Sequence, residues 1–239
     1  MFAQFNRSDR RLVLAILAAV VVFILWNLPQ LGFLLYPFRL FVTYIHESGH
    51  GTAALLTGGR FGGFEIFANG AGQASTTGGS RLLILPAGYL GAALFGAILF
   101  YLNNRFHRSR FLAIVLGIGL IIYSILFGHI ALLSLIVGSL FGVALIALGW
   151  KANDYINSFL LNILAILTGL NAVLDVYQLI GNNGASLGNV RNDAAAFSTE
   201  VFPLPAAFWA LLWSLIALSI LSIAVYYGVI RPIRRGKPE

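Results

Sequence analysis

The sequence predicts an all-α polytopic membrane protein with about six to seven transmembrane helices and a small β-hairpin or re-entrant segment. Hydrophobic residues make up 59% of the 239 residues, and the mean hydropathy is +0.88. Charged residues make up only 10%, against roughly 25% in an ordinary soluble domain. Several apolar runs also reach the roughly 18 residues that a helix needs to cross a hydrocarbon core of about 30 Å. We therefore expect one integral membrane domain over residues 1–239.

The N-terminal part predicts a basic tail followed by two helices. Residues 1–11 form the basic tail, and the apolar run 12–35 is longer than the roughly 7 to 15 residues of a signal-peptide core, so it predicts a retained membrane helix. Pro29 marks the exit from this helix. The next helix is expected over 38–57, because the glycines at 58 and 59 are typical of a helix C-terminus.

The segment 60–80 differs from the rest because it is rich in glycine and polar residues. Asn69-Gly70 lies between two short strand-like runs, which is a strong local signal for a β-hairpin. An exposed hairpin edge can bind an extended peptide by strand addition, and Asn69 and Gly70 are then candidate substrate contacts. A plain surface turn explains the same pattern equally well.

The remaining apolar runs predict further membrane helices with polar or basic connections. Residues 111–150 are too long for one crossing, so we expect a break near 127–129. Residues 181–196 are expected to form a polar loop. The helices are expected over 82–102, over the two halves of 111–150, over 159–180 and over 204–229, and a basic C-terminal tail over 231–239.

The basic segments bear on topology and exclude one class of partner. The net charge of +7 lies mostly at the ends of apolar runs, which favours membrane anchoring in the lipid bilayer and argues against nucleic-acid binding. We expect a multi-pass protein of the cell or plasma membrane with a cytoplasmic C-terminus. If 1–11 and 103–110 are both cytoplasmic, an even number of crossings separates them, but three helices are predicted there. Either the helix over 38–57 does not cross fully, or 60–80 re-enters the membrane.

The chemistry of the chain is concentrated in a His-Glu-x-x-His motif. On a helix, His46 and His50 lie four residues apart on one face and can both present imidazoles to one zinc ion. Glu47 then lies beside the metal as a general base for water. The alternative is a pair of buried, hydrogen-bonded histidines without a metal. Since the chain has no cysteine, any further ligand must be His, Asp or Glu.

The third ligand can be sought among the eight acidic residues. Asp175 alone lies well inside an apolar run, where the cost of burying a carboxylate is offset by a cation, and it is our first choice. Asp193, in the loop before the last predicted helix, is the alternative third ligand. A fourth position left to water is what distinguishes a catalytic zinc site from a structural one.

These features together resemble the site-2 protease family of intramembrane zinc metallopeptidases, and more narrowly its compact M50B-like branch. The resemblance extends from about residue 40 to 215. The residues that carry it are the motif His46-Glu47-Ser48-Gly49-His50-Gly51, Thr57-Gly58-Gly59, the glycine-rich hairpin, a distant Asp, and the segment 189–213. In the second motif of the family, this chain keeps Asn171, Leu174 and Asp175 but lacks the usual Pro and Gly.

The resemblance implies a function and a set of roles. One zinc ion per chain would be held by His46, His50 and Asp175, with Glu47 as the catalytic base, and the substrates would be transmembrane proteins. Separately from the resemblance, Asn171 lies four residues before Asp175 on the same predicted helical face, so we expect it to donate to the oxyanion or to orient a ligand. The alternatives are a non-catalytic homologue that binds or regulates membrane helices and, with less support, a small transporter, since we see no internal repeat. The sequence does not indicate the oligomeric state.

Overall fold

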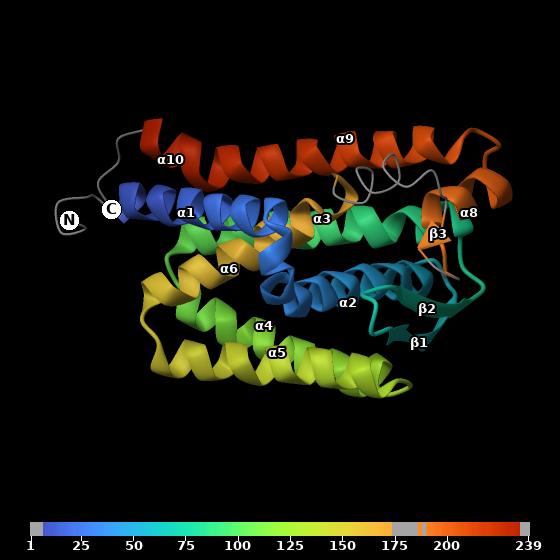
Figure 1. Ribbon diagram of the computed structural model, residues 1–239, viewed down its shortest axis with the longest axis horizontal. Coiled ribbons are helices and arrows are strands. Elements are labelled where there is room, and N and C mark those ends of the chain that lie inside the picture. The colour runs from blue at the N-terminus through green and yellow to red at the C-terminus, as the bar shows by residue number, and fades with distance from the viewer. Residues whose placement is uncertain (1–6, 174–185, 188–189, 235–239) are drawn as a thin grey trace.

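The chain folds as a bundle of long helices with a small antiparallel sheet at one end (Figure 1). The structure is a computed structural model that describes residues 7–173, 186–187 and 190–234. Within these ranges, five helices are long and apolar enough to cross a membrane, which confirms the all-α polytopic prediction. The five spans are Arg10–Asn27, Arg81–Phe106, Ser109–Gly128, Leu132–Lys151 and Ala206–Arg234.

The first two helices differ from the prediction in their bounds. Helix α1 (Arg7–Asn27) begins inside the expected basic tail 1–11 and ends before a 3-10 turn, η2 (Pro29–Leu31). Helix α2 (Gly32–Leu56) then starts six residues earlier than the predicted helix 38–57 and includes Pro37. The expected single helix over 12–35 is therefore wrong, because the chain turns at Pro29. Helix α2 continues through Pro37, although this residue has no N–H to donate to the carbonyl four residues earlier.

The predicted hairpin over 60–80 is confirmed. Strand β1 (Arg60–Ile66) pairs antiparallel with strand β2 (Gly72–Thr77), and Phe64 lies opposite Ala74. The turn contains Gly70, whose φ of 90° lies in the left-handed region that glycine adopts without strain. The outer edge of β1 is anchored, because the N–H of Ile66 donates to Ser134 Oγ at 2.8 Å. Within the described ranges, no further strand pairs with the outer edge of β2, which we call the free edge of the sheet.

The middle of the chain follows the predicted pattern with longer helices. Helix α3 (Arg81–Phe106) returns from the hairpin along the bundle, and it exceeds the expected 82–102 at both ends. The break expected near 127–129 is confirmed. Helix α4 (Ser109–Tyr123) continues into a π-turn, η3 (Ser124–Gly128), and helix α5 (Leu132–Lys151) follows.

The C-terminal third departs further from the prediction. Helix α6 (Asp154–Gly169) begins five residues before the expected 159–180, because the side chain of Asn153 caps it by accepting from the N–H groups of Tyr155 and Ile156. The expected loop 181–196 and tail 231–239 both contain helix. The elements are β3 (Ser186–Leu187), β4 (Val190–Arg191), α8 (Asp193–Glu200), α9 (Ala206–Val225), η4 (Tyr226–Ile230) and α10 (Arg231–Arg234).

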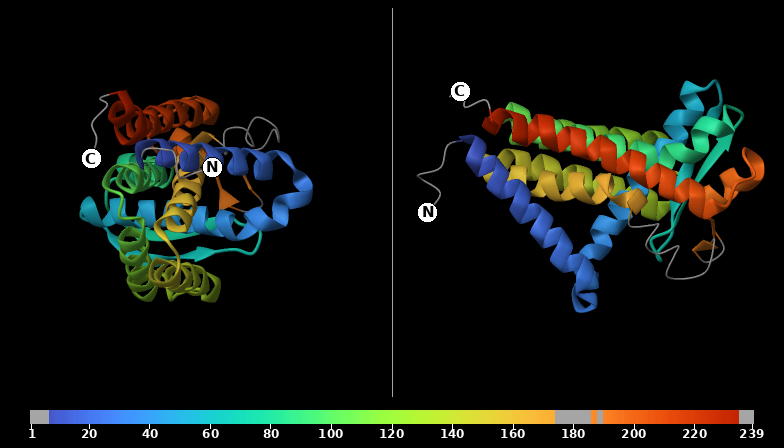
Figure 2. Two further views of the ribbon diagram at one scale, coloured as in Figure 1. Left: turned by 90° about the vertical axis from the view of Figure 1, so that its left-hand side faces the viewer. Right: turned by 90° about the horizontal axis from the view of Figure 1, so that it is seen from above.

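The path of the first three helices resolves the topological conflict. Helices α1 and α2 run one after the other in the same sense along the long axis, and α3 returns (Figures 1 and 2). The start of α1 and the loop after α3 therefore lie at the same end. Arg11 of α1 contacts both sides of this loop, because its Nη1 donates to Asn103 O at 3.0 Å and to Ser109 Oγ at 2.6 Å. The structure accords with the first alternative, in which the motif helix makes no separate crossing.

One face of α2 is fixed by aromatic packing. Phe41, Tyr44 and Phe64 are buried, and the ring of Tyr44 meets that of Phe64 edge-on at 4.9 Å between centroids. The Tyr44 hydroxyl lies 2.8 Å from Ser124 Oγ, which ties α2 to η3. With this face of α2 occupied by the hairpin and η3, another face of α2 packs against α3.

Candidate metal centre

The histidines of the motif lie on a stripe of α2 that lines a pocket of about 600 Å³. Positions three and four apart share one helical face, so a single stripe presents several side chains to the same space. The stripe ends at His50, which is 6% exposed. The other walls come from the end of α1, the hairpin, the start of α3, the end of α6 with the segment after it, and α8. The α2 residues of the stripe are Leu35, Phe38, Arg39, Val42, Thr43, His46, Glu47 and His50.

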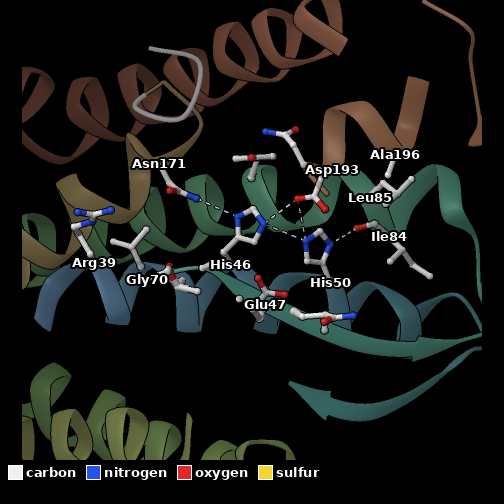
Figure 3. A pocket seen from close by; sticks show the side chains of 18 of the residues that line it. Arg39, His46, Glu47, His50, Gly70, Ile84, Leu85, Asn171, Asp193 and Ala196 are labelled. Atoms are coloured by element: carbon white, nitrogen blue, oxygen red, sulfur yellow. Dashed lines mark hydrogen bonds and ion pairs between the residues drawn. The ribbon is translucent and has the colours of Figure 1, made fainter. Parts of the chain in front are cut away.

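A carboxylate from α8 meets the two histidines. Asp193 Oδ2 lies 2.9 Å from His46 Nε2 and 3.2 Å from His50 Nε2, and the two Nε2 atoms are 3.1 Å apart (Figure 3). Asp193 is the first residue of its helix. Asn192 caps this helix by accepting from the N–H of Ala194 at 2.8 Å, which fixes how the chain enters α8.

The three ligand atoms fit a zinc ion in spacing and in chemistry. Nitrogen and oxygen ligands at about 2.0–2.1 Å in a tetrahedron stand about 3.3–3.4 Å apart. The triangle of 2.9, 3.1 and 3.2 Å is within a few tenths of an ångström of that spacing. Two imidazoles and one carboxylate are also a donor set typical of a catalytic zinc site with one open position.

The space beside the histidines is kept free by Gly88 of α3. A Cβ atom at Gly88 would overlap Nε2 of His46 and stand 2.5 Å from Nε2 of His50. Where α2 packs against α3, a Cβ at Gly49 would also overlap the carbonyl oxygen of Ala87. Glycine at both positions lets α2 and α3 approach closely without filling the region in front of the ligand atoms.

Both imidazoles are oriented by partners at Nδ1. His50 Nδ1 donates to the carbonyl oxygen of Ile84 at 2.7 Å, which leaves Nε2 as the ligand atom. The carboxamide nitrogen of Asn171 lies 3.1 Å from His46 Nδ1. A half-turn of that carboxamide places its oxygen there to accept from Nδ1–H, so the same residue can hold His46 in the tautomer that binds metal. Asn171 thus contacts His46, one of the candidate metal ligands.

The third member of the motif points to the hairpin. Glu47 is 5% exposed, and its carboxylate accepts from the backbone N–H of Ala74 on the free edge of β2. A Cβ at Gly72 would stand 2.6 Å from Glu47 Oε1, so glycine makes room for this carboxylate. Glu47 therefore lies next to the ligand triangle, which is formed by His46, His50 and Asp193, without belonging to it (Figure 3).

The charge state of Asp193 suits a metal ligand. Burial raises the pKa of its carboxyl, but the charge of His50 and the hydrogen bonds from both histidines outweigh burial and hold that pKa below its usual value. The carboxylate form, which is the form that binds cations, is therefore the one that this position favours.

The predicted site residues have different outcomes. His46, His50 and the alternative ligand Asp193 form the one group of three potential ligands found within the described ranges, with their ligand atoms inside 4.8 Å. Asp175, our first choice, lies outside the described residues. Asn69 and Gly70 line the pocket, and the carbonyl oxygen of Gly70 accepts from Thr43 Oγ1 at 2.7 Å.

Sequence reasoning missed some contributions to the site and one signal that was present. Gly88 is expected only as a small residue for helix packing, and the sequence does not show that Gly88 and Gly72 face the site, because nothing in the local sequence says what a glycine will face. Asn192-Asp193 before an alanine run is, however, a recognisable helix start with an acidic first turn. That signal would have moved Asp193 from a loop to a defined position at a helix N-terminus.

Comparison with known proteins identifies a family. A family model described as Peptidase M50B-like matches residues 14–224, which is most of the chain and includes every residue of the ligand triangle. No curated protein and no solved structure matches the chain.

Proposed function

Since the chain belongs to the M50B-like peptidase family, we propose that it is a zinc metallopeptidase that hydrolyses peptide bonds in or near the transmembrane segments of membrane proteins. The observation that carries this proposal is the triangle of His46, His50 and Asp193 with Glu47 beside it. The setting supports it as well, because the pocket lies in a membrane-embedded bundle.

The proposed chemistry divides the work between the ligands and Glu47. A bound zinc ion would act as a Lewis acid toward water and toward the scissile carbonyl. Glu47 takes a proton from the attacking water and later gives it to the nitrogen of the leaving amine. His46 and His50 keep their Nε2 atoms directed at the site through their Nδ1 partners, and Asp193 adds the negative charge that makes the site selective for a cation.

The free edge of β2 is the proposed substrate platform. An extended peptide can add to an exposed strand edge through backbone hydrogen bonds, which requires no particular substrate sequence. The edge is next to the general base, because Ala74 N–H on this edge donates to Glu47. A transmembrane helix would have to unwind locally before its backbone could pair in this way, since helical N–H groups are already bonded.

Two measurements test the proposal. Purified protein is expected to contain about one zinc ion per chain, and the double variant His46→Ala/His50→Ala is expected to lose it, as read by elemental analysis. Glu47→Gln is expected to keep the zinc and lose cleavage of a peptide substrate. Metal-free wild-type protein would refute the metalloenzyme reading. Zinc-loaded wild type that cleaves nothing in a broad peptide pool would favour a non-catalytic homologue.

A further inference from the structure

Arg39 is a charged residue of the pocket that the proposed chemistry does not use. It lies on α2 seven residues before His46, which is two helical turns or about 10 Å along the axis on nearly the same face. Its exposed side chain lines the pocket beside the hairpin turn, with Nη2 3.8 Å from the Cβ position of Gly70. Figure 3 shows Arg39 next to Gly70, at one end of the row that continues through His46 to His50.

The other charged groups of the pocket already have partners. Arg81 and Glu200 form an ion pair with a shortest N–O distance of 2.6 Å. Asp193 contacts both histidines, and Glu47 accepts from a backbone N–H. In the part of the chain that the structure describes, the Arg39 guanidinium has neither a hydrogen bond nor an ion pair. Among the described lining residues, Arg39 is therefore the charged group that an incoming anion can neutralise.

The hairpin lets the distance from Arg39 to the proposed site of cleavage be expressed as a number of peptide residues. The chain from Gly70 to Ala74 runs alongside α2 from Arg39 to Glu47, as the contacts at each end record. The eight helical residues from Arg39 to Glu47 cover about 12 Å, and a fully extended peptide covers about 13 Å in four residues. A peptide strand on the β2 edge, with its scissile bond at Glu47, would bring a residue three or four positions away beside Arg39.

We propose that Arg39 is a specificity-determining residue that binds the side-chain carboxylate of a substrate Asp or Glu three or four residues from the scissile bond. This inference rests on the proposed peptidase function. The planar guanidinium matches a carboxylate with two parallel hydrogen bonds, which are stronger than hydrogen bonds between neutral groups. The substrate class is thus an apolar segment with an acidic residue close to the cleavage site.

The test compares charge preferences of the purified protein in detergent. Pools of acetylated and amidated apolar peptides, in which Asp, Glu, Gln, Lys and Arg vary in position, are digested and the cleavage sites are read by mass spectrometry. Wild type is expected to favour Asp or Glu at one position by roughly threefold to tenfold. Arg39→Gln is expected to lose this preference, and Arg39→Glu to favour Lys or Arg at the same position. Arg105→Gln, which removes an exposed charge at the other end of the bundle, is the matched control and keeps the wild-type preference.

A binding experiment tests the role of Arg39 separately from the proposed peptidase function. In a Glu47→Gln background, fluorescence anisotropy compares labelled peptides that differ only by Glu, Gln or Lys at the varied position. Binding that depends on this charge and on Arg39, without cleavage by the wild type, supports the Arg39 site and removes the peptidase function. Cleavage with no charge preference, or with the same preference in every variant, overturns the Arg39 site and leaves the peptidase function. Absence of both overturns both.

A vesicle experiment tests whether Arg39 binds a lipid phosphate instead of a substrate carboxylate. Wild type and Arg39→Gln are floated with phosphatidylcholine vesicles with and without phosphatidylglycerol. If the substitution weakens only the association with phosphatidylglycerol and leaves the peptide preference unchanged, the guanidinium binds lipid phosphate and the substrate proposal is overturned.

Discussion

Gly88→Ala is the substitution whose effect on metal binding can be worked out most directly. The added Cβ would stand 2.5 Å from His50 Nε2 and even closer to His46 Nε2, whereas ordinary contact needs about 3.4 Å. One or both rings must therefore shift by about 1 Å, against the partners that hold their Nδ1 atoms. Overpacking of this kind costs about 1–3 kcal/mol, which corresponds to a roughly fivefold to hundredfold loss of zinc affinity if it falls on the ligand atoms.

The assay is competition for zinc against a chromophoric chelator in detergent, with thermal unfolding of the metal-free protein measured alongside. The matched control is Gly119→Ala on α4, where a Cβ meets nothing within 4 Å. We expect the control to bind zinc as the wild type does. Wild-type zinc affinity in Gly88→Ala, together with an unchanged melting temperature, would refute the reasoning, because the crowded ligand atoms would then have another position that binds equally well.

Further substitutions test which residues bind the metal and what holds those residues in place. Asp193→Ala is expected to remove bound zinc in elemental analysis, and retention of zinc there combined with its loss in Asp175→Ala would assign the third ligand to the latter position. Asn171→Ala is expected to weaken zinc binding by about tenfold to a hundredfold, since it removes the partner of a ligating histidine; unchanged chelator competition would argue against that positioning role. Arg81→Gln and Glu200→Gln each release one end of α8 from α3, and a double-mutant cycle on zinc affinity is expected to show a coupling of at most about 1 kcal/mol because the pair is partly exposed. A coupling of several kcal/mol would mean that the ion pair, rather than packing, holds α8 in place.

The local features of the molecule were predictable from the sequence because local physics decides them. Asn69-Gly70 predicts the hairpin, since few residues other than glycine tolerate the backbone angle that the turn at Gly70 requires. The break after Phe127 follows from length, because one membrane crossing cannot hold 40 apolar residues. The spacing of His46 and His50 on one helical face is likewise a property of a single helix.

The remaining features depend on tertiary contacts that no local pattern encodes. Pro29 is a sign of a bend in the apolar run 12–35, but a proline alone does not say whether the helix only kinks or the chain turns into a second helix. The third ligand was sought inside apolar sequence, on the argument that a buried carboxylate needs a cation. Asp193 meets that condition from a polar stretch, because α8 packs against α3 and closes over the histidines. Hydrophobicity along the chain could not report this burial.

The ligand triangle also has a consequence for biosynthesis. His46 and Asp193 are 147 residues apart in the chain, and most of the helical bundle is encoded between them. At about 5–20 residues per second, a ribosome that has added the first ligand needs about 7–30 s more to add the last. With Asp193 as the third ligand, the nascent chain carries an incomplete metal centre through the insertion of its helices. The three ligand residues therefore come together only after α8 has been synthesised.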